Sequence, residues 1–225
     1  MNALINAHTQ QEQNCSPHVG LTSSVLPEAQ RSQTGVSSEY VPKEGCYWFV
    51  LRVIYNRTEK AYNIISNANV QSYVPMHYVV KKEIGKKKRI LQHLLPNLFF
   101  IYATREVANT IIKKKGEEPS ILKYYLDKTK SLEGNGKHPP LTIPFTAMIN
   151  FIKATSTESE HVRIVSKEQC HYKSGDIVKV IGGEFEGVVG KIARIAGQQR
   201  VVVEVSGLCL IATAYIPTNF IELVK

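Results

Sequence analysis

The hydrophobic pattern divides the chain into parts with different periods. Residues 1–44 are rich in Gln, Ser, Thr and Asn and sustain no apolar period, which predicts a disordered tail. An aromatic and β-branched pattern begins at Cys46, and short β-branched runs separated by glycines follow Tyr172. We therefore expect one domain over 45–154, a polar linker over 155–170 and a second domain over 171–225.

The first domain begins with a run typical of a buried strand at 47–53. Ala61, Ile64 and Ile65 then have the i, i+3, i+4 spacing of an amphipathic helix. Further patterns predict strands at 70–82, 94–102 and 121–126 and helices at 106–115 and 142–154. The order β-α-β-β-α-β-α predicts an α+β sandwich, with helices packed on an antiparallel sheet.

The second domain is predicted to be a small five-stranded β-barrel. Its apolar runs lie at 172–180, 188–192, 200–205, 209–214 and 220–224. Closing so many short strands into a barrel removes the exposed sheet edges. The density of Val and Ile favours β structure throughout, with no switch to helix. A further short strand is possible at 162–165, inside the linker.

Charge concentrates in the first domain. The chain has a net charge of +9, whereas residues 45–152 carry 17 basic and seven acidic side chains, a net charge of +10. Six basic residues gather between two predicted strands: Lys81, Lys82, Lys86, Lys87, Lys88 and Arg89. This run fits a hairpin tip that contacts nucleic-acid phosphates, or a solvated loop that keeps a sheet edge soluble.

Motifs of zinc-binding, redox, enzymatic and membrane proteins are absent from the sequence. The four cysteines form no close pair, which excludes the common zinc and redox motifs. No nucleotide-binding, hydrolase or metalloprotease motif is present, so we expect no enzyme, no cofactor and no metal. No apolar stretch could span a bilayer and no signal peptide is visible, which predicts a cytoplasmic protein without a membrane partner.

The start of the second domain resembles a KOW motif. The matching positions are Lys173, Gly175, Asp176, Val178, Val180, Gly183, Phe185, Gly187 and Gly190. Gly183 and Gly187 permit positive φ in a tight hairpin, and Gly190 permits close backbone approach in the next strand. Phe185 at the hairpin tip either contacts a partner or closes the end of the barrel.

The first domain resembles the N-terminal (NGN) domain of the NusG family of transcription factors. The opening Trp48–Leu51 strand, the Leu94–Phe100 strand and the helix introduced by Pro144 carry the likeness, which with the KOW motif covers 46–225. Pro96-Asn97 is similar to specialised, operon-specific RfaH-type members. The long polar N-terminal segment resembles UpxY-type antiterminators of capsular polysaccharide operons.

The resemblance implies a monomeric elongation or antitermination factor that binds the clamp helices of RNA polymerase and suppresses pausing. The polymerase-binding residues it implies are Trp48, Leu95, Leu98, Phe99 and Phe100, although strand alternation requires some of them to be core. It places upstream or non-template DNA near the basic run and near Asn109 and Thr110, and a ribosomal protein near Phe185. A general NusG-like factor and a ribosome-associated KOW RNA-binding protein are the alternatives.

Overall fold

The computed structural model describes residues 40–54, 57–83, 85–113 and 120–224. Its α-helices are α1 (Thr58–Ser66), α2 (Arg105–Ile112) and α3 (Phe145–Thr155). The strands of the first half are β1 (Tyr47–Val53), β2 (Gln71–Tyr73), β3 (Met76–Glu83), β4 (Lys86–His93), β5 (Leu98–Ala103), β6 (Leu122–Tyr124) and β7 (Thr142–Ile143). The second half contains β8 (Arg163–Val165), β9 (His171–Val180), β10 (Val189–Ile195), β11 (Gln198–Val205), β12 (Cys209–Tyr215) and β13 (Ile221–Leu223). Short 3₁₀ helices cover Lys167–Gln169 and Thr218–Phe220.

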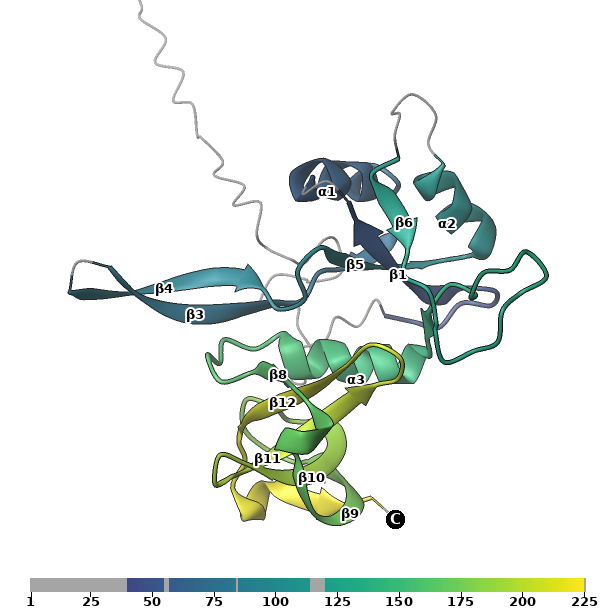
Figure 1. Cartoon of the computed structure of the whole chain (residues 1–225). Helices are drawn as coiled ribbons and strands as arrows, with labels where there is room; N and C mark the ends of the chain where they lie inside the picture. The colour runs from purple at the N-terminus through teal and green to yellow at the C-terminus, as the bar shows by residue number, and fades with distance from the viewer. Residues whose placement is uncertain (1–39, 55–56, 84, 114–119, 225) are drawn as a thin grey trace, which may run out of the picture.

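The first half is an antiparallel sheet between helices, as predicted. The strand order is β2-β5-β1-β6, and β7 also pairs with β1. Helices α1 and α2 cover one face of this central sheet, while α3 lies against the other (Figure 1). We refer to residues 46–155 as the N-terminal module.

Alternation along β1 and β5 gives the central sheet two apolar faces. The α1–α2 face presents Phe49, Leu51, Val53, Phe99 and Ile101. The α3 face presents Trp48, Val50, Leu98, Phe100 and Tyr102. The pairing of β1 with β5 aligns these side chains in register, so both faces are continuous apolar surfaces that helices must cover.

Prolines move several predicted boundaries. The single strand expected at 70–82 is interrupted at Val74–Pro75, and β3 then pairs with β4 as a separate hairpin. The strand expected from Leu94 begins at Leu98, because Asn97 has a φ of 60° and turns the chain after Pro96. The last helix starts only after Pro144, which cannot donate a main-chain hydrogen bond to a sheet.

The five strands predicted for the second half are present, but they do not form the predicted barrel. The observed order is β13-β9-β10-β11-β12-β8, and in the described chain no pairing joins the outer strands β13 and β8. Strand β8, which falls inside the predicted linker, pairs with the edge of β12 that closure would have used. We call this open six-stranded sheet, residues 163–223, the C-terminal sheet.

Two glycine predictions from the β9–β10 region are confirmed. Gly183 and Gly187 both have a φ of 79° in the turn that leads to β10. A Cβ on Gly190 would lie 2.4 Å from the carbonyl oxygen of Val202, so β10 and β11 approach too closely there for any side chain. By contrast, Gly175 and Asp176 lie within β9, where the pairing with β10 is interrupted.

Helix α3 joins the two halves through one apolar core. A single cluster of buried side chains runs from Trp48 and Phe100 through Phe151 on α3 to Val180 and Val203 in the C-terminal sheet. Polar contacts accompany it: the Asn150 side chain accepts from the main-chain N–H of Val189 at 2.7 Å and donates to its carbonyl at 2.5 Å. The C-terminal sheet therefore packs against α3 as part of the same core (Figure 1).

Candidate functional site

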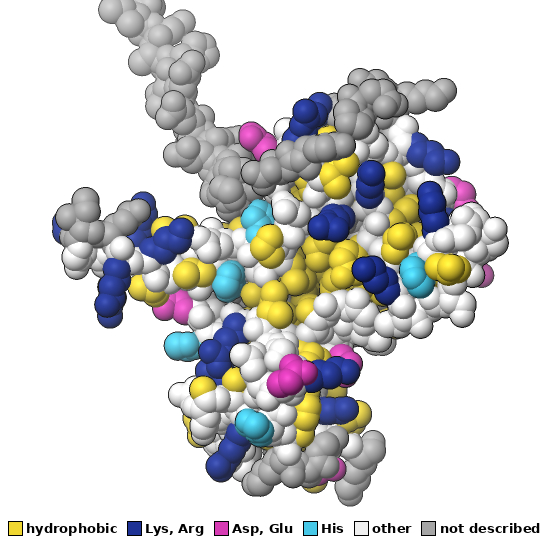
Figure 2. Space-filling view, in the orientation of Figure 1, with side chains coloured by type: hydrophobic (Ala, Val, Ile, Leu, Met, Phe, Trp, Pro, Cys, Tyr) yellow, Lys and Arg dark blue, Asp and Glu magenta, His cyan; other side chains and the backbone are white. Residues whose placement is uncertain are grey.

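The basic run forms a projecting two-stranded arm. We call the β3–β4 hairpin, residues 76–93, the basic arm; it extends away from the central sheet (Figure 1). Figure 2 shows Lys and Arg side chains along this arm. The sequence placed these residues at the tip between two strands, whereas all six lie within β3 and β4 themselves. All six predicted basic residues are exposed: Lys81, Lys82, Lys86, Lys87, Lys88 and Arg89.

The register of the basic arm places like charges directly opposite each other. Lys81 pairs with Lys88, and Lys82 pairs with Lys87. Directly opposed like charges destabilise a hairpin, so this pattern does not arise from the stability of the arm itself. Opposed pairs point to the two faces of the ribbon in turn, and each face therefore carries a concentrated positive charge. Such a surface is suited to a polyanion.

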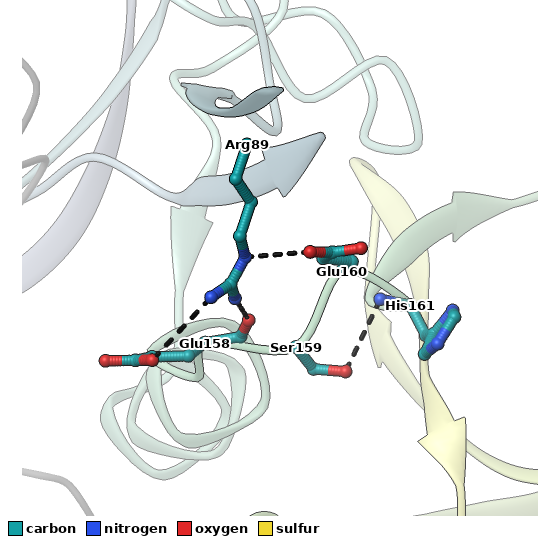
Figure 3. Close-up of polar contacts among 5 residues, drawn as sticks. All are labelled: Arg89, Glu158, Ser159, Glu160 and His161. Atoms are coloured by element: carbon teal, nitrogen blue, oxygen red, sulfur yellow. Dashed lines mark hydrogen bonds and ion pairs between the residues drawn. The ribbon is translucent and has the colours of Figure 1, made fainter. Parts of the chain in front are cut away.

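Arg89 is held by acidic partners from the segment after α3 (Figure 3). Its Nε lies 2.8 Å from a carboxylate oxygen of Glu160, and its Nη1 lies 4.0 Å from the carboxylate of Glu158. Its Nη2 also donates to the main-chain carbonyl of Glu158. The guanidinium lies 4.1 Å from the ring centre of Tyr78, which adds a cation–π contact. The structure thus distinguishes Arg89 from the five lysines.

The acidic partners of Arg89 lie in a segment connected to both halves. The main-chain N–H of His161 donates to the Ser159 hydroxyl at 3.4 Å, and Arg200 on β11 donates to the His161 carbonyl at 3.0 Å. Sequence reasoning treated this segment as part of a linker and missed the contact. The available signal was the closely spaced pair Glu158 and Glu160, which could neutralise part of a basic run elsewhere in the chain.

Helix α2 presents the other two predicted nucleic-acid residues. The Asn109 side-chain oxygen accepts from the Tyr124 hydroxyl at 2.9 Å, whereas exposed Thr110 donates to the carbonyl of Glu106 at 3.0 Å. The Arg105 guanidinium lies 5.0 Å from the ring centre of Tyr124. Partial burial raises the pKa of Tyr124, so its hydroxyl remains a donor at neutral pH. Sequence reasoning did not identify Arg105 or Tyr124.

The five residues suggested for polymerase binding are all buried in this arrangement. Leu95 and Leu98 are 7% and 9% exposed, and Trp48, Phe99 and Phe100 are exposed by 1% or less. The alternation expected for the strand is observed: Leu98 and Phe100 lie on the α3 face and Phe99 on the α1–α2 face. The least buried pair, Leu95 and Leu98, lies together at the Pro96-Asn97 turn before β5.

Phe185 is also buried, with 4% of its surface exposed, and belongs to the core cluster that includes Val180 and Val188. The alternative role, closing the end of a barrel, does not apply because the sheet is open, and the ring instead packs into the core. A role for Phe185 in contacting a partner stays a prediction.

A shallow groove of about 230 Å³ lies between α3 and the turn into β10. Its lining residues are Phe145, Thr146, Ile149, Asn150, Lys153, Gly187 and Val189. Burial, and then repulsion from Lys179, lower the pKa of Lys153 at this groove. The groove marks the boundary across which Asn150 binds the C-terminal sheet.

Comparison with known families matches part of the chain. The family described as NusG, transcription termination factor nusG, matches residues 46–124. Residues 46–124 thus resemble NusG. The match spans β1 to β6 and contains the basic arm, which supports the NusG family and suggests a factor that acts in transcription elongation or termination. It is consistent with a protein that is not an enzyme.

No curated protein matches the chain. Within the described ranges, no three His, Cys, Asp or Glu side chains group closely enough to hold a metal ion. No helix in the described part of the chain is long and apolar enough to cross a membrane.

Proposed function

We infer that this protein is a transcription elongation and antitermination factor that binds RNA polymerase through its N-terminal module and suppresses pausing or termination. The observation that carries this function is the NusG match over 46–124, the segment that forms the central sheet and the basic arm. The proposed partner surface is the clamp helices. The proposed docking residues lie on β1, in the turn before β5 and on β5: Trp48, Leu95, Leu98, Phe99 and Phe100. An apolar surface that receives helices is a known recognition mode.

The basic arm supports a second contact, with duplex DNA beside the polymerase. The five lysines are exposed, and the opposed pairs Lys81–Lys88 and Lys82–Lys87 have no role in stabilising the hairpin. Contacts to phosphates would give affinity that depends on salt and not on sequence. Asn109 and Thr110 on α2 are the proposed contacts to an exposed DNA strand.

Polymerase binding is tested by co-purification and titration with purified RNA polymerase. We expect Leu95→Ala with Leu98→Ala to lose about 2 kcal/mol or more of binding free energy, roughly a thirtyfold weaker complex. Leu122→Ala is the control, since Leu122 is also a buried leucine but packs in the core on the α1–α2 face. Circular dichroism establishes that each variant is folded. Equal affinities for the double variant and the control would refute this docking surface.

The DNA contact is tested by the salt dependence of binding to duplex DNA. Replacing both Lys81 and Lys88 by alanine should lower the slope of log K against log salt by about 2, because each phosphate contact contributes about 0.9. Lys167 and Lys191, exposed lysines outside the basic arm, provide the control double variant. An unchanged slope would assign the basic arm to solubility alone.

The operon-specific form of this function rests on Pro96-Asn97 and on the long polar N-terminal segment. Polysaccharide biosynthesis operons are the proposed targets. A transcription assay on templates with the leader of such an operon should show more readthrough than the same assay with an unrelated leader. Equal readthrough on both templates would favour a general NusG-like factor.

A further inference from the structure

A short segment before β1 lies across one end of the α3 face. We call residues 40–46 the strap. The Tyr40 ring centre lies 5.9 Å from that of Trp48, which in turn lies 5.3 Å from Tyr102. Tyr102 continues the row to Phe145 on α3, at 5.5 Å. The strap thus places Tyr40 at the end of an aromatic row that continues through Trp48 and Tyr102 on the α3 face.

One hydroxyl group fixes the strap to the sheet. The Tyr102 hydroxyl accepts from the main-chain N–H of Lys43 at 2.7 Å and donates to the Lys43 carbonyl, 3.3 Å away. The same carbonyl accepts from the N–H of Cys46 at 3.2 Å, and Gly45 has a φ of 69° in the turn between them. The Tyr102 side chain therefore binds both the main-chain N–H and the main-chain carbonyl of Lys43 in the strap.

The strap makes much less buried contact than the elements around it. Residues 41–45 are exposed, and Tyr40 and Cys46 are half-buried. Segments with few buried apolar contacts and exposed backbone open locally at low free energy. Beneath the strap, β5 is buried along its whole length and Trp48 on β1 is fully buried, so the strap can open while the sheet remains folded.

The residue beneath the strap has an unused hydrogen-bond donor. Trp48 is completely buried, yet its indole N–H has no acceptor among the residues that the structure describes. Buried donors in native proteins are nearly always satisfied, so this one calls for an explanation. An incoming segment with a main-chain carbonyl or a carboxylate could accept from it once Tyr40 has moved away.

We propose that the strap is a removable cover over the aromatic end of the docking surface, and that RNA polymerase competes with it for Trp48 and Tyr102. This inference rests on the proposed function. The partner it requires presents apolar side chains to the two rings and an oxygen acceptor to the indole N–H. Opening of the strap then sets the fraction of molecules that can bind, and the apparent affinity falls by that fraction.

Trp48 is the only tryptophan in the chain, so its fluorescence reports directly on the strap. In the full chain, Tyr102→Phe removes the hydroxyl that holds Lys43 but keeps the ring, and Tyr40→Ala removes the covering ring. We expect each change to increase acrylamide quenching of Trp48 about twofold or more, since both favour local opening. Tyr47→Phe is the control, because Tyr47 is exposed and lies on the opposite side of β1 from Trp48.

The same variants are then titrated with RNA polymerase. Tyr102→Phe should bind about three- to tenfold more tightly than the wild type, because less of the population is closed. Quenching that stays at the wild-type level in both variants would refute the removable strap. Increased quenching with unchanged affinity would refute the competition. Absence of binding by the wild type itself would refute the proposed function, and the quenching data would still decide whether the strap opens.

Discussion

The two faces of the central sheet are covered in different ways. The α1–α2 face is closed within the N-terminal module, where Phe49 and Phe99 pack against Ala61, Ile65 and Ala108. The α3 face opens into a larger core that continues through the helix into the C-terminal sheet. The α1–α2 face therefore stabilises the N-terminal module alone, whereas the α3 face connects that module to the C-terminal sheet. Of the proposed polymerase-binding residues, all but Phe99 belong to the core on the α3 side of the central sheet.

The largest expected effect comes from deleting a ring at the centre of the connecting face. Phe151 is fully buried on α3, with ring centres 5.4 Å from Phe100 and 6.1 Å from Tyr73. Phe151→Ala should cost about 3–5 kcal/mol of unfolding free energy, from lost burial and the cavity that remains. Denaturant unfolding followed by Trp48 fluorescence measures this loss.

The two faces are distinguished by which strands lose stability in Phe151→Ala. Native-state hydrogen exchange of Phe151→Ala should show lower protection in β11 and β12 as well as in β1 and β5. The control is Ile65→Ala, a buried residue of α1 on the other face. It should lower protection in the N-terminal module and spare the C-terminal sheet. Unaltered protection of β11 and β12 in Phe151→Ala would show that the two halves unfold independently.

Local patterns were enough to predict much of this fold. Strand alternation in Leu98–Phe100 correctly divided the side chains between two faces, and glycine positions identified the turn before β10 and the close approach at Gly190. These features depend on neighbours in sequence or on the covalent properties of one residue. They do not require knowledge of what lies across the core.

Long-range pairings were not predictable in the same way. The basic run was expected at a tip, but Pro75 separates β2 from β3 and lets the lysines extend along two strands. Closure into a barrel failed because β8, only three residues long, pairs with the open edge of β12. The contact of Arg89 with Glu160 joins positions 71 residues apart, and no local period indicates it. The candidate site was thus predicted as a set of residues, without its internal contacts.

The next largest loss of unfolding free energy is expected from Gly190→Ala in the C-terminal sheet. A Cβ at position 190 would lie 2.4 Å from the Val202 carbonyl oxygen and 2.8 Å from a side-chain carbon of Val201. Because the nearest atom belongs to the backbone of the next strand, Gly190→Ala should cost about 3 kcal/mol through displacement of β10. Thermal unfolding measures the change.

Gly134→Ala is the control for this substitution, since a Cβ added at Gly134 would have no neighbouring atom within 4 Å. If the core is continuous, Gly190→Ala should also lower the midpoint of the Trp48 fluorescence transition, although Trp48 lies in the other module. A transition in Trp48 that remains at the wild-type midpoint would contradict coupling through α3.

A smaller effect is expected from the polar contact across the groove. Asn150→Ala removes both hydrogen bonds to Val189 and leaves a main-chain N–H and carbonyl without these partners. The expected cost is about 2 kcal/mol, the penalty typical of unsatisfied groups at a partly buried site. Thr146→Ala, one turn earlier on α3, replaces an exposed residue that lines the same groove and should be nearly neutral. Equal stability of the two variants would show that the Asn150 hydrogen bonds do not help to hold the C-terminal sheet against α3.

The smallest expected change in stability is at Arg89. Its side chain is 43% exposed and that of Glu160 is 34% exposed, so solvent screens the ion pair and Arg89→Ala should cost less than about 1 kcal/mol. The geometric effect should be larger, because this contact ties the basic arm to the segment that leads into the C-terminal sheet. Spin labels on the arm and on β12 should show a broader distance distribution in Arg89→Ala, and about 1 M salt should broaden it similarly in the wild type. Lys87→Ala, which removes a neighbouring charge without this contact, should keep the narrow distribution but weaken DNA binding. If instead Arg89→Ala keeps the narrow distance distribution and weakens DNA binding, Arg89 contacts phosphates in the same way as the lysines. The position of the arm is then set by the core on the α3 face alone.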